Sequence, residues 1–80
     1  MPYRRIVKIT IELFGQLSPL SPRRQTLDLT EHATVQEAAA LLRLQQDEIG
    51  LITINGVQSE MQDQLTPQCR LCLFPYLSGG

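Results

Sequence analysis

The chain has 80 residues, which is enough for one small domain and leaves no room for a second hydrophobic core. Its formal net charge is −1 at pH 7, so the composition gives no reason to expect nucleic acid or an anionic membrane as a partner. No apolar run approaches the roughly 20 residues of a membrane span, and the start of the chain lacks the apolar core of a signal peptide. We therefore expect a cytoplasmic domain that is too thin to enclose a deep active site and presents its functional groups at the surface.

The first predicted element is a strand over residues 6–14, where apolar and polar side chains alternate. This alternation predicts four core-facing residues: Val7, Ile9, Ile11 and Leu13. Phe14 then falls on the opposite face. Two Ser-Pro pairs within residues 15–22 predict a loop, and a second strand follows at residues 25–29. The two strands form an antiparallel hairpin if they pair directly.

A helix is predicted next, from Thr34 to about Leu44. The segment Thr34-Val-Gln-Glu37 has the form of a capping box, in which the threonine oxygen accepts from an amide and Glu37 reaches back. One apolar stripe follows the helical period: Val35, Ala38, Ala39 and Leu42. The three consecutive alanines, residues 38–40, let the helix lie close to a sheet.

Two more strands complete the predicted order, one after Gly50 at residues 51–54 and a last one at residues 70–74. Asn55-Gly56 is a strong turn signal, and an irregular stretch follows in which Leu65 is expected to fill the core. Pro75 ends the last strand because proline cannot donate a hydrogen bond to a neighbouring strand.

This order predicts the fold class α+β and, within it, a β-grasp. We expect a mixed sheet of four to five strands with one main helix packed on one face, and the first and last strands side by side. Residues 1–74 then form the domain, and residues 75–80 form a flexible C-terminal tail.

The predicted tail ends in Tyr76-Leu77-Ser78-Gly79-Gly80. A Gly-Gly end carries no side chain and adopts backbone angles that other residues cannot, so it can thread a narrow channel of another protein. A carboxylate is a poor electrophile, but adenylation by ATP makes it reactive, and a sulfur nucleophile can then convert it to a thiocarboxylate. The chain offers no evident base, metal or nucleophile for these steps, so we expect a substrate of an activating enzyme rather than an enzyme.

Four segments carry a resemblance to a known family: Ile9-Thr-Ile-Glu-Leu-Phe-Gly15, Thr34-Val-Gln-Glu-Ala38, Ile54-Asn-Gly56 and Leu73-Phe-Pro-Tyr-Leu-Ser-Gly-Gly80. They resemble the MoaD/ThiS sulfur carriers, which are relatives of ubiquitin. The Phe-Pro pair before the tail looks more like the molybdopterin synthase small subunit than the thiamin carrier, whereas Tyr76 replaces a second proline often seen there.

The resemblance implies that Gly80 is adenylated by a MoeB/ThiF-type enzyme, takes sulfur from a sulfur donor enzyme and delivers it in molybdopterin (or tungsten pterin) biosynthesis. A molybdopterin synthase large subunit is then a further partner, and no cofactor is bound by the chain itself. It also implies a partner interface at Phe14, Phe74 and Pro75; Phe14 and Phe74 are the only phenylalanines and are both predicted on the open sheet face. Three alternatives stay open: a carrier for thiamin, transfer-RNA or amino-acid sulfur transfer, a ubiquitin-like modifier conjugated through Gly80, and a β-grasp binding module whose tail is inert.

Three weaker signals are interpreted as ordinary structure. Cys69-Arg-Leu-Cys72 is a single C-x-x-C pair in a strand, so we expect two buried or half-buried thiols and no metal site. His32 is expected at the surface, and the Arg23-Arg24 pair is interpreted as solvated charge.

Overall fold

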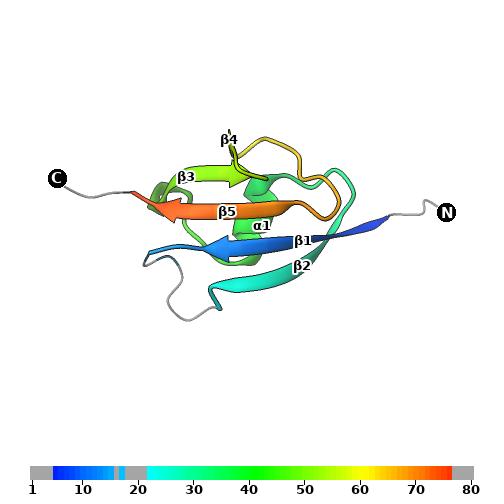
Figure 1. Ribbon diagram of the computed structural model, residues 1–80, viewed down its shortest axis with the longest axis horizontal. Helices are drawn as coiled ribbons and strands as arrows, with labels where there is room; N and C mark the ends of the chain where they lie inside the picture. The colour runs from blue at the N-terminus through cyan, green and yellow to red at the C-terminus, as the bar shows by residue number, and fades with distance from the viewer. Residues whose placement is uncertain (1–4, 16, 18–21, 77–80) are drawn as a thin grey trace.

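The computed structural model describes residues 5–15, 17 and 22–76. The elements in chain order are β1 (Ile6–Leu13), β2 (Arg24–Thr30), α1 (Val35–Leu41), the 3₁₀ turn η1 (Gln46–Glu48), β3 (Ile49–Ile54), β4 (Val57–Ser59) and β5 (Arg70–Pro75). The strands form one sheet in the order β2-β1-β5-β3-β4 (Figure 1). The central pair β1 and β5 is parallel, and the other neighbours are antiparallel. The β-grasp prediction is confirmed, including the adjacent first and last strands.

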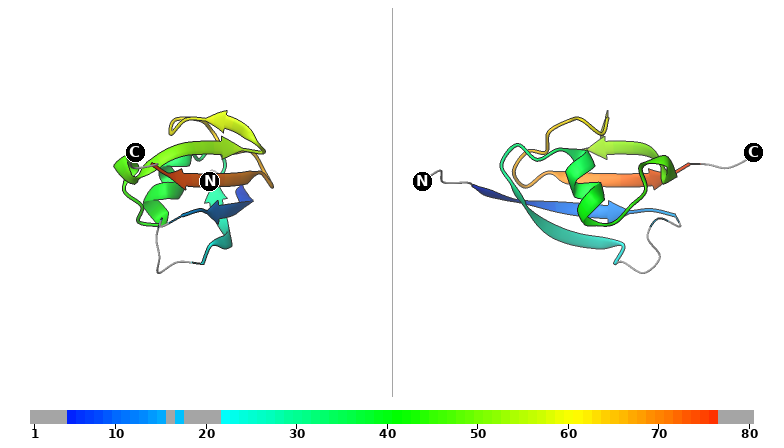
Figure 2. Two further views of the ribbon diagram at one scale, coloured as in Figure 1. Left: turned by 60° about the vertical axis from the view of Figure 1, so that its left-hand side comes forward. Right: turned by 180° about the vertical axis from the view of Figure 1, so that it is seen from behind.

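The helix α1 crosses one face of the sheet, as the rear view in Figure 2 shows, and we call the opposite face the open face. The predicted core residues of β1 are all buried, and Ile9 and Ile11 are inaccessible to solvent. In β5 the same holds for Leu71 and Leu73, so the two central strands supply the middle of the core. None of the helices in the described part of the chain has the length and apolar character that crossing a bilayer takes.

The start of α1 is held by its own cap and by a distant loop. The Thr34 hydroxyl accepts a hydrogen bond from the Glu37 amide at 3.3 Å, which confirms one half of the capping box. The return bond from the Glu37 side chain to the Thr34 amide is not among the hydrogen bonds of the described residues, and the Glu37 side chain is exposed to solvent. Instead, the Val35 amide donates to the Asp63 carbonyl oxygen at 3.0 Å, and the amide after it donates to the Met61 carbonyl oxygen at 2.9 Å. These bonds pair amides that have no partner within the helix.

The end of α1 comes three residues earlier than the predicted Leu44, at Leu41. Arg43 adopts a left-handed backbone with φ of 60°, which stops the helix. The Arg43 amide donates to the Ala40 carbonyl and the Leu44 amide to the Ala39 carbonyl, both at 3.0 Å. This pair of bonds is a Schellman motif, and it returns Leu44 to the core instead of continuing the helix.

Strand β3 starts at Ile49, two residues before the predicted Leu51, because Gly50 lies within the strand as a bulge. The register against β5 shifts between Ile49 and Leu51. The extra residue puts Ile49 and Ile52, which are three apart, on the core side, and both are buried. Sequence alternation alone cannot show such a shift.

The remaining differences lie between β3 and β5. The Asn55-Gly56 turn has φ values of 52° and 83°, as the primed hairpin turn requires, and it leads into β4 where an irregular stretch was expected. Leu65 is buried as predicted, at 3% exposure. The last strand continues through Pro75, one residue further than predicted, since a proline at the end of a strand can still pair through its carbonyl group.

Candidate functional site

Two stacked phenylalanines lie next to the end of β5. The parallel register pairs Leu13 with Leu73, so the residues that follow them, Phe14 and Phe74, are neighbours. Their ring centroids are 4.4 Å apart and their planes differ by 11°. Both side chains are half-buried and neither belongs to the core cluster, which confirms the predicted orientation toward the open face. We call them the aromatic pair.

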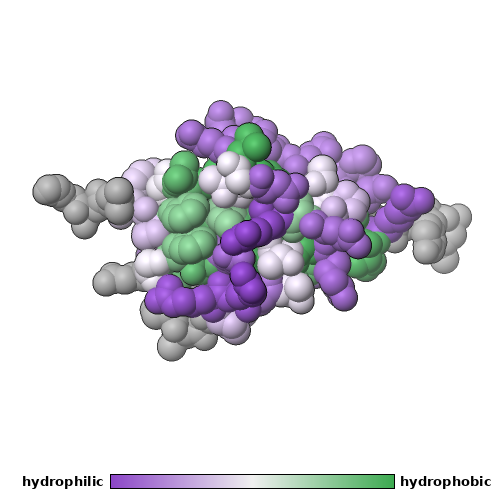
Figure 3. Space-filling view, in the orientation of Figure 1, coloured by the Kyte–Doolittle hydropathy of each residue, from purple (hydrophilic) through white to green (hydrophobic). Residues whose placement is uncertain are grey.

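The open face is apolar at one end and charged beside it. Figure 3 shows the apolar surface gathered toward the end of the sheet where β5 finishes, with hydrophilic side chains across the middle. A hollow of about 490 Å³ lies there, lined by Phe14, Phe74, Cys72, Arg70 and Thr53 among others. The predicted role of the aromatic pair and Pro75 as a partner interface stays a prediction.

Pro75 and Tyr76, which we call the tail root, remain attached to the sheet. Pro75 pairs with Ile49 of β3, and the Tyr76 amide donates to the Glu48 carbonyl oxygen at 3.4 Å. The Tyr76 side chain is exposed. The other predicted tail residues, Leu77, Ser78, Gly79 and Gly80, lie outside the described residues.

Two glycines that the sequence did not single out as site residues approach the tail root. Gly15, just after the aromatic Phe14, lies against the Pro75 ring, and Gly50 lies against the backbone of Pro75 and Tyr76. The signal available in the sequence was a glycine at the end of the first strand and another at the start of the third. What each glycine contacts depends on the register of three strands.

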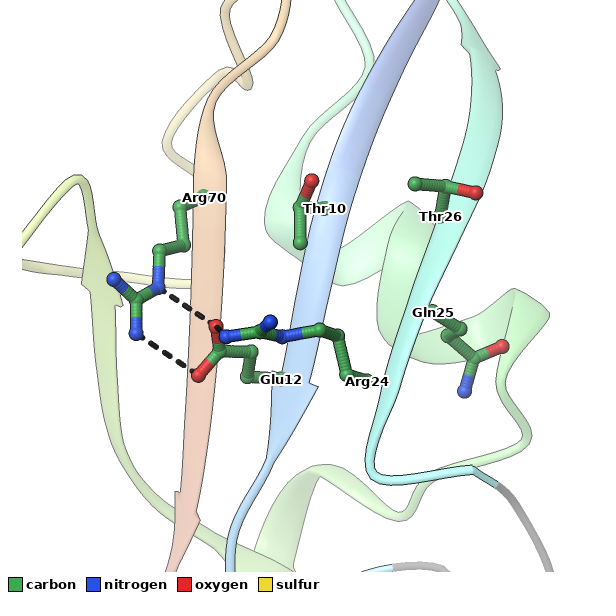
Figure 4. A pocket seen from close by; sticks show the side chains of 6 residues that line it. All are labelled: Thr10, Glu12, Arg24, Gln25, Thr26 and Arg70. Carbon is green, nitrogen blue, oxygen red and sulfur yellow. Dashed lines mark hydrogen bonds and ion pairs between the residues drawn. The ribbon is translucent and has the colours of Figure 1, made fainter.

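A second feature missed from the sequence is an ion cluster on the open face, formed by Glu12 of β1, Arg24 of β2 and Arg70 of β5 (Figure 4). Arg70 Nη2 donates a hydrogen bond to Oε1 at 3.0 Å, and Arg70 Nε forms an ion pair with Oε2 at 2.9 Å. Arg24 Nη2 donates to Oε2 at 3.0 Å. Arg70 first, and then Arg24, hold the pKa of the Glu12 carboxyl below its ordinary value, against the opposing effect of burial.

The ion cluster is therefore one carboxylate between two guanidinium groups, and it carries a net positive charge. The Arg24 and Arg70 side chains are 73% and 57% exposed, so both remain accessible to a partner. Arg23 and Arg24 are both exposed to solvent, as interpreted from the sequence, and each also makes a bond within the protein, since Arg23 donates to the Gly15 carbonyl oxygen at 2.7 Å. Glu12 shares the open-face parity of Phe14, but its partners on two other strands could not be assigned without the register.

The weaker sequence signals have ordinary structural roles. Cys69 and Cys72 are both free and buried; Cys69 belongs to the core cluster and Cys72 lines the hollow on the open face. His32 is exposed, and its ring lies 3.3 Å from the side-chain oxygen of Gln64. Within residues 5–15, 17 and 22–76, no three His, Cys, Asp or Glu side chains form a cluster that could hold a metal ion.

Several solved structures have the same fold. The chain superposes on SAMP1 from Haloferax volcanii with a TM-score of 0.73 and 23% identity, over 91% of this chain and 99% of that one. A putative molybdopterin converting factor, subunit 1, from Pyrococcus furiosus gives a TM-score of 0.69 and 17% identity over 86% and 97%. A ubiquitin from Caldiarchaeum subterraneum gives 0.63 and 20% over 95% and 100%. Comparison of the sequence with protein-family models and with curated proteins gives no match.

These similarities define the class of fold: the chain is a ubiquitin-like β-grasp domain. The structural neighbours are consistent with the resemblance to the MoaD/ThiS proteins. Because all identities are below 25%, the likeness establishes the shared fold, and function requires a separate argument.

Proposed function

We propose that this chain is a ubiquitin-like sulfur carrier that acts through the carboxylate of Gly80. One observation supports the proposal above the others: the tail root emerges directly beside the aromatic pair, and only Leu77 to Gly80 follow in the sequence. A partner that binds the aromatic pair would then lie within reach of the Gly-Gly end. The proposal requires that Gly80 is the last residue of the mature protein.

The chemistry consists of two steps at the Gly80 carboxylate. In the first, a carboxylate oxygen attacks the α-phosphorus of ATP, pyrophosphate leaves, and an acyl adenylate forms. In the second, a hydrosulfide group attacks the carbonyl carbon, the bond to the adenylate oxygen breaks, and AMP leaves with that oxygen. The product is a thiocarboxylate, whose sulfur can be passed to an acceptor.

In this proposal the chain is the substrate, and its partners supply the catalytic groups. A MoeB/ThiF-type enzyme performs the adenylation with ATP, and a sulfur donor enzyme supplies the nucleophile. We propose a cytoplasmic location, where ATP is available to the activating enzyme. The exposed guanidinium groups of the ion cluster lie on the same face as the aromatic pair, so we expect acidic side chains on the matching surface of the partner.

We propose molybdopterin or a tungsten relative as the destination of the sulfur, delivered through a synthase large subunit. The Pyrococcus neighbour described as a molybdopterin converting factor supports this choice. The modifier alternative, in which Gly80 is joined to lysines, is favoured by two neighbours: the small archaeal modifier SAMP1 and the archaeal ubiquitin. Sulfur delivery and conjugation to lysines would both start from the Gly80 acyl adenylate.

Intact-mass measurement tests the proposal. The purified protein, first shown to end at Gly80, is incubated with a MoeB/ThiF-type enzyme of its source organism, ATP and a sulfide donor. Exchange of oxygen for sulfur raises the mass by about 16 Da and supports the carrier. Conjugates of higher mass in cell extract support the modifier instead.

Two tail variants serve as controls for the same assay. Deletion of Gly80, or addition of one residue after it, is expected to abolish activation because the carboxylate no longer meets the nucleotide. Neither change touches the described fold, so both variants should melt as the unmodified protein does. Sulfur transfer retained by either variant refutes the tail mechanism.

A further inference from the structure

The tail root is enclosed from two sides by glycine backbone. A Cβ atom added at Gly15 would lie 2.5 Å from Cγ and 3.0 Å from Cδ of Pro75. A Cβ atom added at Gly50 would lie 2.8 Å from Cα of Tyr76 and 2.9 Å from the Pro75 carbonyl oxygen. Cβ atoms essentially never come within 3.0 Å of such neighbours, so a methyl group at either position must change the contact between the glycine and the tail root.

Each glycine is itself fixed by the sheet. Gly15 has φ of +65°, a backbone conformation that side chains disfavour, and its carbonyl oxygen accepts the 2.7 Å hydrogen bond from Arg23. Gly50 is the bulged residue of β3, and its neighbour Ile49 is buried in the core. Gly15 thus lies just after β1 and is bonded to the residue that precedes β2, whereas Gly50 lies within β3.

The aromatic pair lies next to the tail root, with Phe74 in β5 and Phe14 just after β1. Phe14 directly precedes Gly15, and Phe74 directly precedes Pro75. The stacked rings therefore adjoin both the tail root and the glycine that contacts the Pro75 ring. The Phe14 amide also donates to the Leu73 carbonyl oxygen at 3.0 Å, which ties the two strands together at this point. The aromatic pair and the tail root therefore form one rigid unit.

We propose that Gly15 and Gly50 are positioning residues, which fix the tail root relative to the aromatic pair and so set the point from which the C-terminal residues extend. This inference rests on the proposed carrier function and deepens it. The four residues after Tyr76 span at most about 14 Å, so the position of the tail root decides where the carboxylate can reach. A displacement of about 1 Å at a reacting group can lower a rate on the order of a hundredfold.

The test compares Gly15→Ala and Gly50→Ala with Gly56→Ala in the adenylation assay, measured as pyrophosphate release. Gly56 has φ of +83° and no atom within 4 Å of the added Cβ, so its substitution strains a turn without touching the tail root. We expect kcat to fall on the order of tenfold to a hundredfold in the first two variants, with KM for the carrier changed less than about threefold. The Gly56→Ala variant should keep kcat; because Gly56 lines the hollow on the open face, the control concerns kcat and not KM.

A second substitution separates the ring contact from the backbone contact. The atoms that crowd Gly15 belong to the Pro75 ring, whereas those nearest Gly50 belong to the backbone. Replacing the ring, Pro75→Ala, should therefore reduce the kcat loss caused by Gly15→Ala and leave the loss caused by Gly50→Ala in place. Equal losses in both backgrounds for Gly15→Ala contradict the proposed contact.

A measurement on the isolated protein distinguishes failure of this inference from failure of the carrier function. Exchange of the Tyr76 amide hydrogen, which is bonded to the Glu48 carbonyl, should rise on the order of tenfold in Gly50→Ala and stay unchanged in Gly56→Ala. If the unmodified protein is never adenylated, the carrier function is wrong, and unchanged exchange in Gly50→Ala overturns the positioning contact independently. Normal kcat in folded Gly15→Ala and Gly50→Ala overturns the positioning role alone.

Should either alanine variant not fold, one insertion keeps the inference testable. A glycine inserted between Tyr76 and Leu77 leaves every described contact in place and lengthens the reach by about 3.5 Å. We expect it to lower kcat on the order of tenfold without raising KM. An unchanged kcat in this variant shows that the reach from the tail root does not affect the reaction, and it overturns the positioning role.

Discussion

Truncation of Phe74 to alanine is the sharpest test of the aromatic pair, because stability and binding should respond differently. Phe74 is half-buried, so its removal should cost less than the roughly 3–5 kcal/mol of a phenylalanine in a closed core. The lost stacking on Phe14 contributes about 0.5–1.5 kcal/mol. Allowing for the partial burial, we expect a total loss of about 1–2 kcal/mol, or a fall in melting temperature of roughly 5–15 °C.

The free energy of binding to the activating enzyme should fall by more than the free energy of unfolding. If Phe74 anchors the partner interface, its truncation should weaken binding to the activating enzyme by about 2–4 kcal/mol, the range of interface anchors. This corresponds to an increase in Kd of roughly 30-fold to 1000-fold. Isothermal titration calorimetry with the enzyme, below the melting temperature of the variant, measures Kd, and circular dichroism measures the melting temperature.

Two matched variants control this comparison. Leu73 is the neighbour of Phe74 in β5 but faces the core and is inaccessible to solvent, so Leu73→Ala should cost about 2–5 kcal/mol of stability and leave the Kd of the folded fraction unchanged. Leu41 lies at the end of α1 and is 61% exposed, so Leu41→Ala should change neither the stability nor the Kd. A large stability loss in Phe74→Ala with unchanged binding refutes the assignment of the aromatic pair to the partner interface.

Three further predictions concern the fold. Glu12→Gln should destabilise the protein at pH 7. Because the pKa of Glu12 is lowered in the folded state, its contribution to stability is present above the ordinary carboxyl pKa. In urea titrations the difference between the two proteins should therefore vanish as the pH falls through the pKa of Glu12 in the folded state. A constant difference down to pH 2 would contradict the pairing with Arg24 and Arg70. Arg43→Gly should raise the free energy of unfolding by about 1 kcal/mol, because glycine adopts φ of 60° without strain, and an unchanged value would contradict the Schellman account. Thr34→Ala should lower it by about 1 kcal/mol through loss of the helix cap, which thermal melting can check against a neutral Gln36→Ala control.

Much of the fold follows from local pattern. Alternation in β1 identified its core side correctly, since Val7, Ile9, Ile11 and Leu13 are all buried. The Asn55-Gly56 turn was located from two residues because few other pairs adopt the required positive φ. The predictions that were wrong involve special backbone: Arg43 ends α1 although arginine is a good helix former, and Gly50, which the sequence placed before β3, bulges inside it.

The candidate site was predicted in part for a related reason. Parity within a strand placed Phe14 and Phe74 on the open face, but the stacking distance of 4.4 Å depends on the parallel pairing of β1 with β5. The bond between Glu12 and Arg70 joins residues 58 apart in the sequence, so no local pattern could reveal it. The predicted domain boundary at Pro75 stays a prediction, and the tail residues 77–80 lie outside the described part of the chain.

The parallel register of β1 and β5 links these observations into one physical argument. Pairing Leu13 with Leu73 brings Phe14-Gly15 beside Phe74-Pro75, so a single register decides both the stacked surface and the tail root. A slip of β1 by one residue would turn Phe14 toward the helix and would also separate the Pro75 ring from Gly15, which has no Cβ atom. A slip of two residues would keep the faces but would move the tail root by about 7 Å relative to Phe14. The core residues of both strands exclude the first slip, and the Gly15 contact excludes the second, so the position of the tail follows from the same packing that stabilises the fold.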